Sequence, residues 1–122
     1  MRLFLGMMIV LSLAGCAPST DDWIGQLKNS DVVKRREAIR ELGSRPAEAA
    51  QVVPALTEAL RDESAYVRRD AALALAKFAQ AAKEAVPALT AALKDKDHNV
   101  RLAAGTALKK IDAQAASKAG IH

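Results

Sequence analysis

Apolar residues in the middle of the chain recur at the three- and four-residue steps of an α-helix. Two such faces follow one another: Val53, Leu56 and Leu60, then Val67, Ala71, Leu75 and Phe78. A short polar segment separates them. The pattern therefore predicts two amphipathic helices joined by a turn, each burying one apolar face.

The same pattern returns 33 residues later. Val53-Pro54-Ala55-Leu56-Thr57 recurs as Val86-Pro87-Ala88-Leu89-Thr90. A more divergent copy lies 33 residues earlier, with Trp23 in the place of Leu56. A fixed period of this length is typical of stacked helical repeats. We therefore predict one repeat domain over residues 21–112, with hairpins at about 21–44, 46–79 and 80–112, followed by a tail at 113–122.

Residues at the ends of the predicted helices agree with this division. Short oxygen-bearing side chains precede each second helix at equivalent positions: Asp31, Ser64 and Asp97. Such residues cap helix N-termini and stabilise them by about 1 kcal/mol. Prolines are expected in first turns, where a missing N–H costs little: Pro46, Pro54 and Pro87. Gly43 is suited to a helix end.

The repeated pattern Val-Pro-Ala-Leu-x-x-Ala-Leu-x-Asp-x-x-x-x-Val-Arg-x-x-Ala-x-x-Ala-Leu resembles the short bacterial HEAT repeat, also named after phycobilisome-lyase-like proteins. The resemblance extends from about Trp23 to Ile111. It implies an all-α fold, a right-handed α-solenoid with the second helices on its inner face. It also implies that aspartates and arginines at fixed positions form a ladder between repeats: Arg35, Asp62, Arg68, Asp95 and Arg101. A basic stripe that grips phosphate or carboxylate is the alternative for these arginines.

Some positions of the second helices differ between copies, whereas the predicted core positions do not. Variable side chains on a repeated frame are where a solenoid places its specificity. The candidate binding face comprises Arg36, Arg40, Tyr66, Arg69, Asp70, Leu73, Leu102 and Thr106. The spacing also places Glu37 and Ala103 on this outward side. A merely solvated face is the alternative interpretation.

Composition favours close-packed helices over β-sheets, and the side chains present offer little for catalysis. Apolar residues make up 51% of the chain but aromatic residues only 3%, and a formal charge of +4 is weak evidence for an anionic partner such as nucleic acid. His98 and His122 are the two histidines, so one domain cannot assemble a histidine triad or a two-histidine metal site. We expect no catalytic residue, metal or cofactor, and we expect Trp23 to cover the amino-terminal end of the stack.

The amino terminus carries the features of an export signal. Arg2 precedes an apolar segment at residues 3–13, which as a helix spans about 16 Å, roughly half the thickness of a membrane's hydrocarbon region. Leu13-Ala14-Gly15-Cys16 resembles the lipobox of bacterial lipoproteins. The resemblance implies a signal peptide at 1–15, cleavage between Gly15 and Cys16, and acyl chains on Cys16 ahead of a linker ending at residue 20. Because Ala17 rather than aspartate follows, it also implies the outer membrane, facing the periplasm, where the host has one.

These patterns together predict a membrane-anchored, non-catalytic adaptor of the bacterial cell envelope. Its expected partner is a protein, and weak self-association at an exposed end of the stack is compatible with only three repeats. Two alternatives remain open at this stage: an accessory subunit of an envelope enzyme, and a passive structural spacer.

Overall fold

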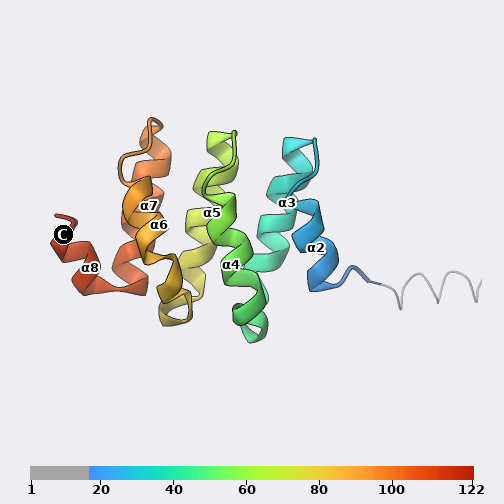
Figure 1. Ribbon diagram of the computed structural model, residues 1–122, viewed down its shortest axis with the longest axis horizontal. Helices are drawn as coiled ribbons and strands as arrows, with labels where there is room; N and C mark the ends of the chain where they lie inside the picture. The colour runs from blue at the N-terminus through green and yellow to red at the C-terminus, as the bar shows by residue number, and fades with distance from the viewer. Residues whose placement is uncertain (1–16) are drawn as a thin grey trace, which may run out of the picture.

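The computed structural model describes residues 17–122, which fold into seven α-helices and two short 3-10 helices without a strand (Figure 1). The elements are α2 (Thr20–Gln26), α3 (Val32–Gly43), η1 (Pro46–Glu48), α4 (Ala49–Ala59), α5 (Ala65–Lys77), η2 (Ala79–Ala85), α6 (Val86–Ala92), α7 (His98–Ile111) and α8 (Ala113–Lys118). The predicted all-α solenoid of about three hairpins is confirmed.

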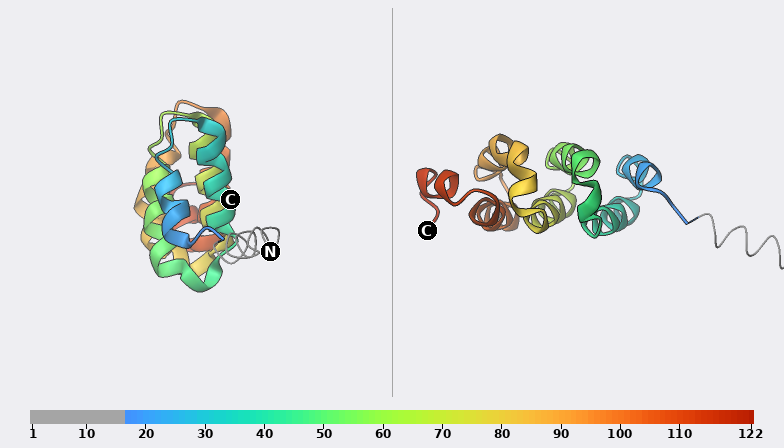
Figure 2. Two further views of the ribbon diagram at one scale, coloured as in Figure 1. Left: turned by 90° about the vertical axis from the view of Figure 1, so that its right-hand side faces the viewer. Right: turned by 90° about the horizontal axis from the view of Figure 1, so that it is seen from below.

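The helices form two layers that run the length of the stack (Figure 2). The first-helix layer contains α2, α4 and α6, and the second-helix layer contains α3, α5 and α7. Within the second-helix layer α5 packs against both α3 and α7, and each of these helices also contacts the first helix of its own hairpin. The N-terminal helix α2 and the C-terminal helix α8 therefore lie at opposite ends of the molecule.

The core lies between the layers and is built from the repeated apolar positions. Fully buried leucines occupy equivalent places along the stack: Leu42, Leu75 and Leu108 on the second helices, with Leu56 and Leu89 on the first helices. Burying a leucine side chain stabilises a fold by about 1.5–3 kcal/mol. Alanines at another equivalent position, Ala38, Ala71 and Ala104, are also fully buried. Their small side chains allow neighbouring helices to approach closely.

The predicted helix ends are correct in part. Asp31 Oδ1 accepts a hydrogen bond from the Val33 backbone N–H at 2.9 Å, and Asp97 caps α7 in the same way. Ser64 occupies the N-cap position of α5, but its side chain makes no capping bond. Its backbone N–H donates to Asp62 Oδ1 at 2.9 Å, so here the preceding aspartate organises the turn.

Pro54 is not in a first turn, contrary to the prediction. Helix α4 begins at Ala49, five positions earlier, and Pro54 lies inside it. The alanines that precede the proline favour helix and extend it backwards. Ala50 and Pro54 are both exposed, so water has access to the carbonyl that proline leaves without an N–H partner, which reduces the cost of the interior proline.

Two glycines mark close contacts. Gly43 ends α3, and a Cβ atom there would lie 3.3 Å from the Ala74 Cβ of α5. At the other end of the stack, a Cβ at Gly105 would lie 3.6 Å from Ile121 Cγ2. Ile121 is tied back by its N–H, which donates to the Ala116 carbonyl at 2.9 Å. Helix α8 and Ile121 thus cover part of the core at the C-terminal end.

Candidate functional site

Two buried ion pairs join neighbouring hairpins at one edge of the stack. Arg35 donates from Nε and Nη2 to the Asp62 carboxylate at 2.9 and 3.1 Å. Arg68 binds Asp95 with the same two distances. Only 7% and 8% of the two arginine side chains is exposed. Because the bidentate geometry fixes both distance and orientation, these pairs hold adjacent hairpins in register.

Each aspartate of the ladder also organises its own turn. Asp62 Oδ1 accepts from the Ser64 backbone N–H, and Asp95 Oδ1 accepts from the Asp97 N–H, both at 2.9 Å. The hydrogen bond from Arg68 holds the pKa of Asp95 below its ordinary value, although burial of the carboxyl opposes this shift. Asp95 is therefore a charged structural residue and not a proton carrier.

The ladder ends differently at the two ends of the stack. Asn29 takes the aspartate position in the first hairpin, and its Oδ1 accepts from the Asp31 N–H at 2.8 Å. It preserves the turn without a charge. Arg101 donates to the Asp95 carbonyl at 2.7 Å, and its Nη2 lies 3.5 Å from His98 Nδ1. Arg101 has no carboxylate partner within residues 17–122.

The outward side of α3, α5 and α7 is here called the second-helix surface. It carries Arg36 and Arg40 on α3, Tyr66, Arg69, Asp70 and Leu73 on α5, and Leu102 and Thr106 on α7. Tyr66 is 62% exposed, Leu102 57% and Leu73 42%. The remaining exposed large apolar residue of the described chain, Val33, also lies on a second helix. Large apolar side chains that face water are therefore confined to the second helices within residues 17–122.

A charged and aromatic cluster occupies the middle of this surface. The Cζ atoms of Arg36 and Arg69 lie 5.4 and 5.8 Å from the centre of the Tyr66 ring, within cation–π range. Asp70 accepts from Arg36 Nε at 2.7 Å and from Arg69 Nη2 at 3.0 Å. Because Arg36 is on α3 and the others are on α5, the cluster ties two hairpins together and holds the exposed ring in place.

Sequence comparison identifies the repeat. The protein family described as HEAT repeats matches residues 20–83, more than half of the chain. The chain belongs to the HEAT-repeat family. A HEAT-like repeat also matches residues 67–111. Among curated proteins, no sequence matches this HEAT-repeat chain.

A solved structure is similar to this HEAT-repeat chain in both fold and sequence. It is the complex of CpcE and CpcF of phycocyanin lyase from Nostoc sp. PCC7120, and the similarity covers 83% of this chain at 32% identity with a TM-score of 0.74. The matched region is 40% of that chain, so this sequence spans less than half of its length. The predicted resemblance to lyase-type HEAT repeats is confirmed.

One position of the predicted outward side is wrong. Ala103 is only 4% exposed, although its equivalent Asp70 reaches the second-helix surface. Asp70 is itself half-buried at the edge of the groove between α3 and α5. At such a boundary position a small alanine is covered by its neighbours, whereas a longer charged side chain extends out to its partners. Periodicity alone does not distinguish the two cases.

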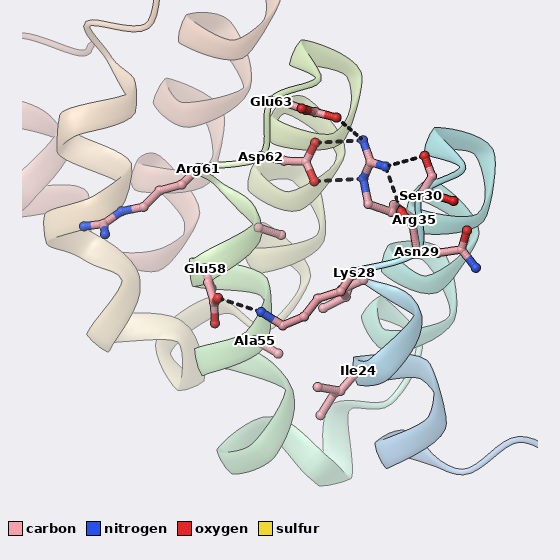
Figure 3. A pocket seen from close by; sticks show the side chains of 12 residues that line it. Ile24, Lys28, Asn29, Ser30, Arg35, Ala55, Glu58, Arg61, Asp62 and Glu63 are labelled. Atoms are coloured by element: carbon pink, nitrogen blue, oxygen red, sulfur yellow. Dashed lines mark hydrogen bonds and ion pairs between the residues drawn. The ribbon is translucent and has the colours of Figure 1, made fainter.

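One pocket in the described part of this HEAT-repeat chain was not predicted from the sequence. It has a volume of about 700 Å³ and lies between α2 and α4 in the first-helix layer (Figure 3). The Arg35–Asp62 pair lies along it, and Lys28 Nζ donates to Glu58 Oε1 across it at 3.2 Å. No buried side-chain polar atom in residues 17–122 lacks a hydrogen-bond partner. The buried polar groups of the pocket are thus already paired within the described residues.

Trp23 lies at the N-terminal end of the stack. It is half-buried and packs against the core. It also lines a shallow pocket of about 440 Å³ together with Pro18, Gln26 and Lys34. This placement matches the expected covering role. Tyr66, on the second-helix surface, is by contrast exposed.

The described residues offer little for metal chemistry. No three His, Cys, Asp or Glu side chains between residues 17 and 122 gather closely enough to hold a metal ion. His98 is exposed at the start of α7. The described side chains instead form a structural ladder of ion pairs and a surface of mixed polar and apolar character.

Cys16 and Gly15 lie outside the described residues, and the predicted lipidation and cleavage therefore stay predictions. The chain enters α2 directly after residues 17–19. Ser19 caps this helix, and hydrogen bonds from its backbone N–H and its hydroxyl hold the pKa of Asp22 below the ordinary value. In the part of the chain that the structure describes, each helix is too short or too polar to cross a bilayer.

Proposed function

We propose that this HEAT-repeat chain is a non-catalytic adaptor that binds a protein partner through its second-helix surface. The observation that carries the proposal is the confinement of large exposed apolar side chains to the second helices. Tyr66 is held beside two guanidinium groups. Tyrosine and arginine are enriched among residues that dominate binding energy at protein interfaces. A ring that is already positioned loses less conformational freedom on binding.

We further propose that the adaptor is a lipoprotein anchored through Cys16, on the outer membrane facing the periplasm where the host has one. The lipobox at residues 13–16 and the alanine at position 17 support this. Residues 17–19 would then be the whole tether before α2. Three extended residues reach about 10 Å, so the domain and its partner would lie next to the membrane.

A second candidate function is that of an accessory subunit of an enzyme. The similarity to a chain from the CpcE–CpcF complex of phycocyanin lyase favours it, because that structure is a complex of two named subunits. Both candidates require a protein partner. They differ in whether the complex recovered with this chain performs a reaction that neither component performs alone.

Crosslinking and affinity purification of the full chain from its own membrane tests the adaptor function. Leu73→Ser with Leu102→Ser removes apolar contacts from the second-helix surface. Ala81→Ser with Ala91→Ser is the matched control, because both alanines are exposed and lie in η2 and α6 on the other layer. We expect a reproducible protein partner that the control retains and the surface variant loses. Recovery of no partner, or equal recovery with both variants, contradicts the proposal and favours a passive spacer.

A further inference from the structure

A groove between α3 and α5 opens on the second-helix surface beside the Tyr66 cluster. Its volume is about 230 Å³, enough for a few side-chain atoms but not for a folded ligand. Its lining comprises Arg36, Ile39 and Arg40 from α3 and Asp70, Leu73, Ala74 and Lys77 from α5. Three cations and one carboxylate therefore surround a partly apolar floor, which leaves the groove with an excess of positive charge.

Several cationic donors of this groove have no partner among residues 17–122. Arg36 uses Nε on Asp70, but neither of its terminal nitrogens makes a hydrogen bond within this range. Arg40 and Lys77 are exposed and belong to none of the ion pairs in the described residues. The arginines of the buried ladder, by contrast, use Nε and both terminal nitrogens on protein acceptors. The groove thus differs from the ladder in having unoccupied donors.

The spacing of these cations fits a peptide. Arg36 and Arg40 are four residues apart on α3, so their Cα atoms are separated by about 6 Å along the helix axis. Side chains on the same face of an extended peptide repeat every two residues, about 6.6 Å. Two carboxylates in alternate positions therefore match the two arginines. Lys77, four residues after Leu73 on α5, provides a cation on the opposite wall.

We propose that this groove binds the carboxylates of an acidic segment of the partner protein. The inference rests on the proposed adaptor function and names the chemistry of its partner. Ile39 and Ala74 are buried, Leu73 is partly exposed, and together they give the groove an apolar floor for the methylenes of a glutamate. Asp70 places a negative charge at one edge of the groove; a peptide can put an uncharged residue beside it, whereas a continuous phosphate backbone or a phosphate-rich membrane surface cannot avoid it.

The test uses the full chain with Cys16→Ser, which removes any acyl chain, and a fluorescent peptide of alternating glutamate and leucine. Arg40→Gln with Lys77→Gln neutralises the groove. Lys83→Gln with Lys94→Gln is the matched control, since both lysines are exposed, lie away from the groove lining and form no ion pair in residues 17–122. Circular dichroism checks that each variant keeps its helices. Two further probes are an uncharged peptide of alternating glutamine and leucine, which tests the need for carboxylates, and vesicles of phosphatidylglycerol, which test binding to a membrane surface.

The groove variant is expected to bind the acidic peptide about tenfold more weakly than the unmodified groove, with the control within about twofold. The glutamine peptide should bind at least tenfold more weakly than the acidic one. Equal affinity of both variants, no binding of the acidic peptide at millimolar concentration, or vesicle binding that alone depends on Arg40 and Lys77 would overturn the inference.

Capture of the native partner separates this inference from the adaptor function. If the groove variant retains a partner that Leu73→Ser with Leu102→Ser loses, the adaptor function stands and the acidic-segment inference fails. If the unmodified chain captures no partner, the adaptor function itself fails, whatever the peptide does.

Discussion

Replacing Asp62 with asparagine tests how much the buried ladder stabilises the stack. The substitution removes the charge that faces Arg35 but preserves the shape of the side chain. Asn29, at the equivalent position of the first hairpin, shows that asparagine keeps the turn, since its Oδ1 accepts from the Asp31 N–H at 2.8 Å. Asp62→Asn should therefore perturb the ion pair and leave the turn intact.

The expected loss is about 2 kcal/mol. Removing one partner of a buried ion pair costs about 3–5 kcal/mol. The asparagine oxygen still accepts one hydrogen bond, worth about 1 kcal/mol. Glu63, whose Oε1 lies 3.7 Å from Arg35 Nη2 in an exposed position, offers a partial replacement. A further loss of about 1 kcal/mol is expected for Asp62→Ala, because alanine also removes the bond to the Ser64 N–H.

Urea unfolding followed by circular dichroism measures these changes. Glu58→Gln is the control, because it breaks the exposed Lys28–Glu58 pair, which contributes at most about 1 kcal/mol. On thermal unfolding, 2 kcal/mol corresponds to a fall of roughly 10 °C or more in Tm for a domain of this size. An Asp62→Asn protein as stable as Glu58→Gln would refute the idea that the ladder holds the hairpins together.

Further predictions concern the buried carboxylate of Asp95, two glycines and the lipid anchor. The pKa of Asp95 is lowered in the folded chain. Its contribution to stability is therefore present above the unfolded pKa of about 3.9 and is lost as pH falls through the folded pKa. In an acid titration, the free energy of unfolding of Asp95→Asn should therefore depend less on pH over this range than that of the unmodified chain. Gly25→Ala should stabilise the chain by about 0.5–1 kcal/mol, since nothing lies within 4 Å of the added Cβ. Gly43→Val should destabilise it by about 1–3 kcal/mol, because the added side chain would collide with Ala74. Urea unfolding measures both changes. Cys16→Ser should move the protein from the membrane to the soluble fraction, and an unchanged distribution on fractionation would refute lipid anchoring.

The sequence alone predicts the two-layered fold because the repeat contains it three times. Leucines at a spacing of 33 residues can all be buried only if equivalent helices stack in register, as Leu42, Leu75 and Leu108 do. The resemblance to HEAT repeats likewise implied that Arg35 and its equivalent Arg68 pair with aspartates at the junctions between hairpins, as they do. These features depend on local periodicity and on repetition, both of which are visible in a single sequence.

Other features depend on contacts that the period does not encode. The Arg36–Asp70 pair joins residues 34 positions apart, so it links non-equivalent positions of two hairpins. The groove beside this pair therefore cannot be deduced by aligning the repeats with one another. Ser64 takes the same N-cap position as Asp31 and Asp97, and its N–H makes the same bond two residues back, yet its side chain makes no capping bond. Such choices between polar partners become visible only in three dimensions.

Site-specific photo-crosslinking tests the central claim most directly. A photoreactive amino acid at Thr106 would report from α7 on the second-helix surface, and one at Thr90 would report from α6 on the other layer; both threonines are exposed. In the native membrane, the adaptor account predicts a covalent adduct with one partner protein from position 106 and none from position 90. Equal adducts from both positions, or an adduct from position 90 alone, would contradict it.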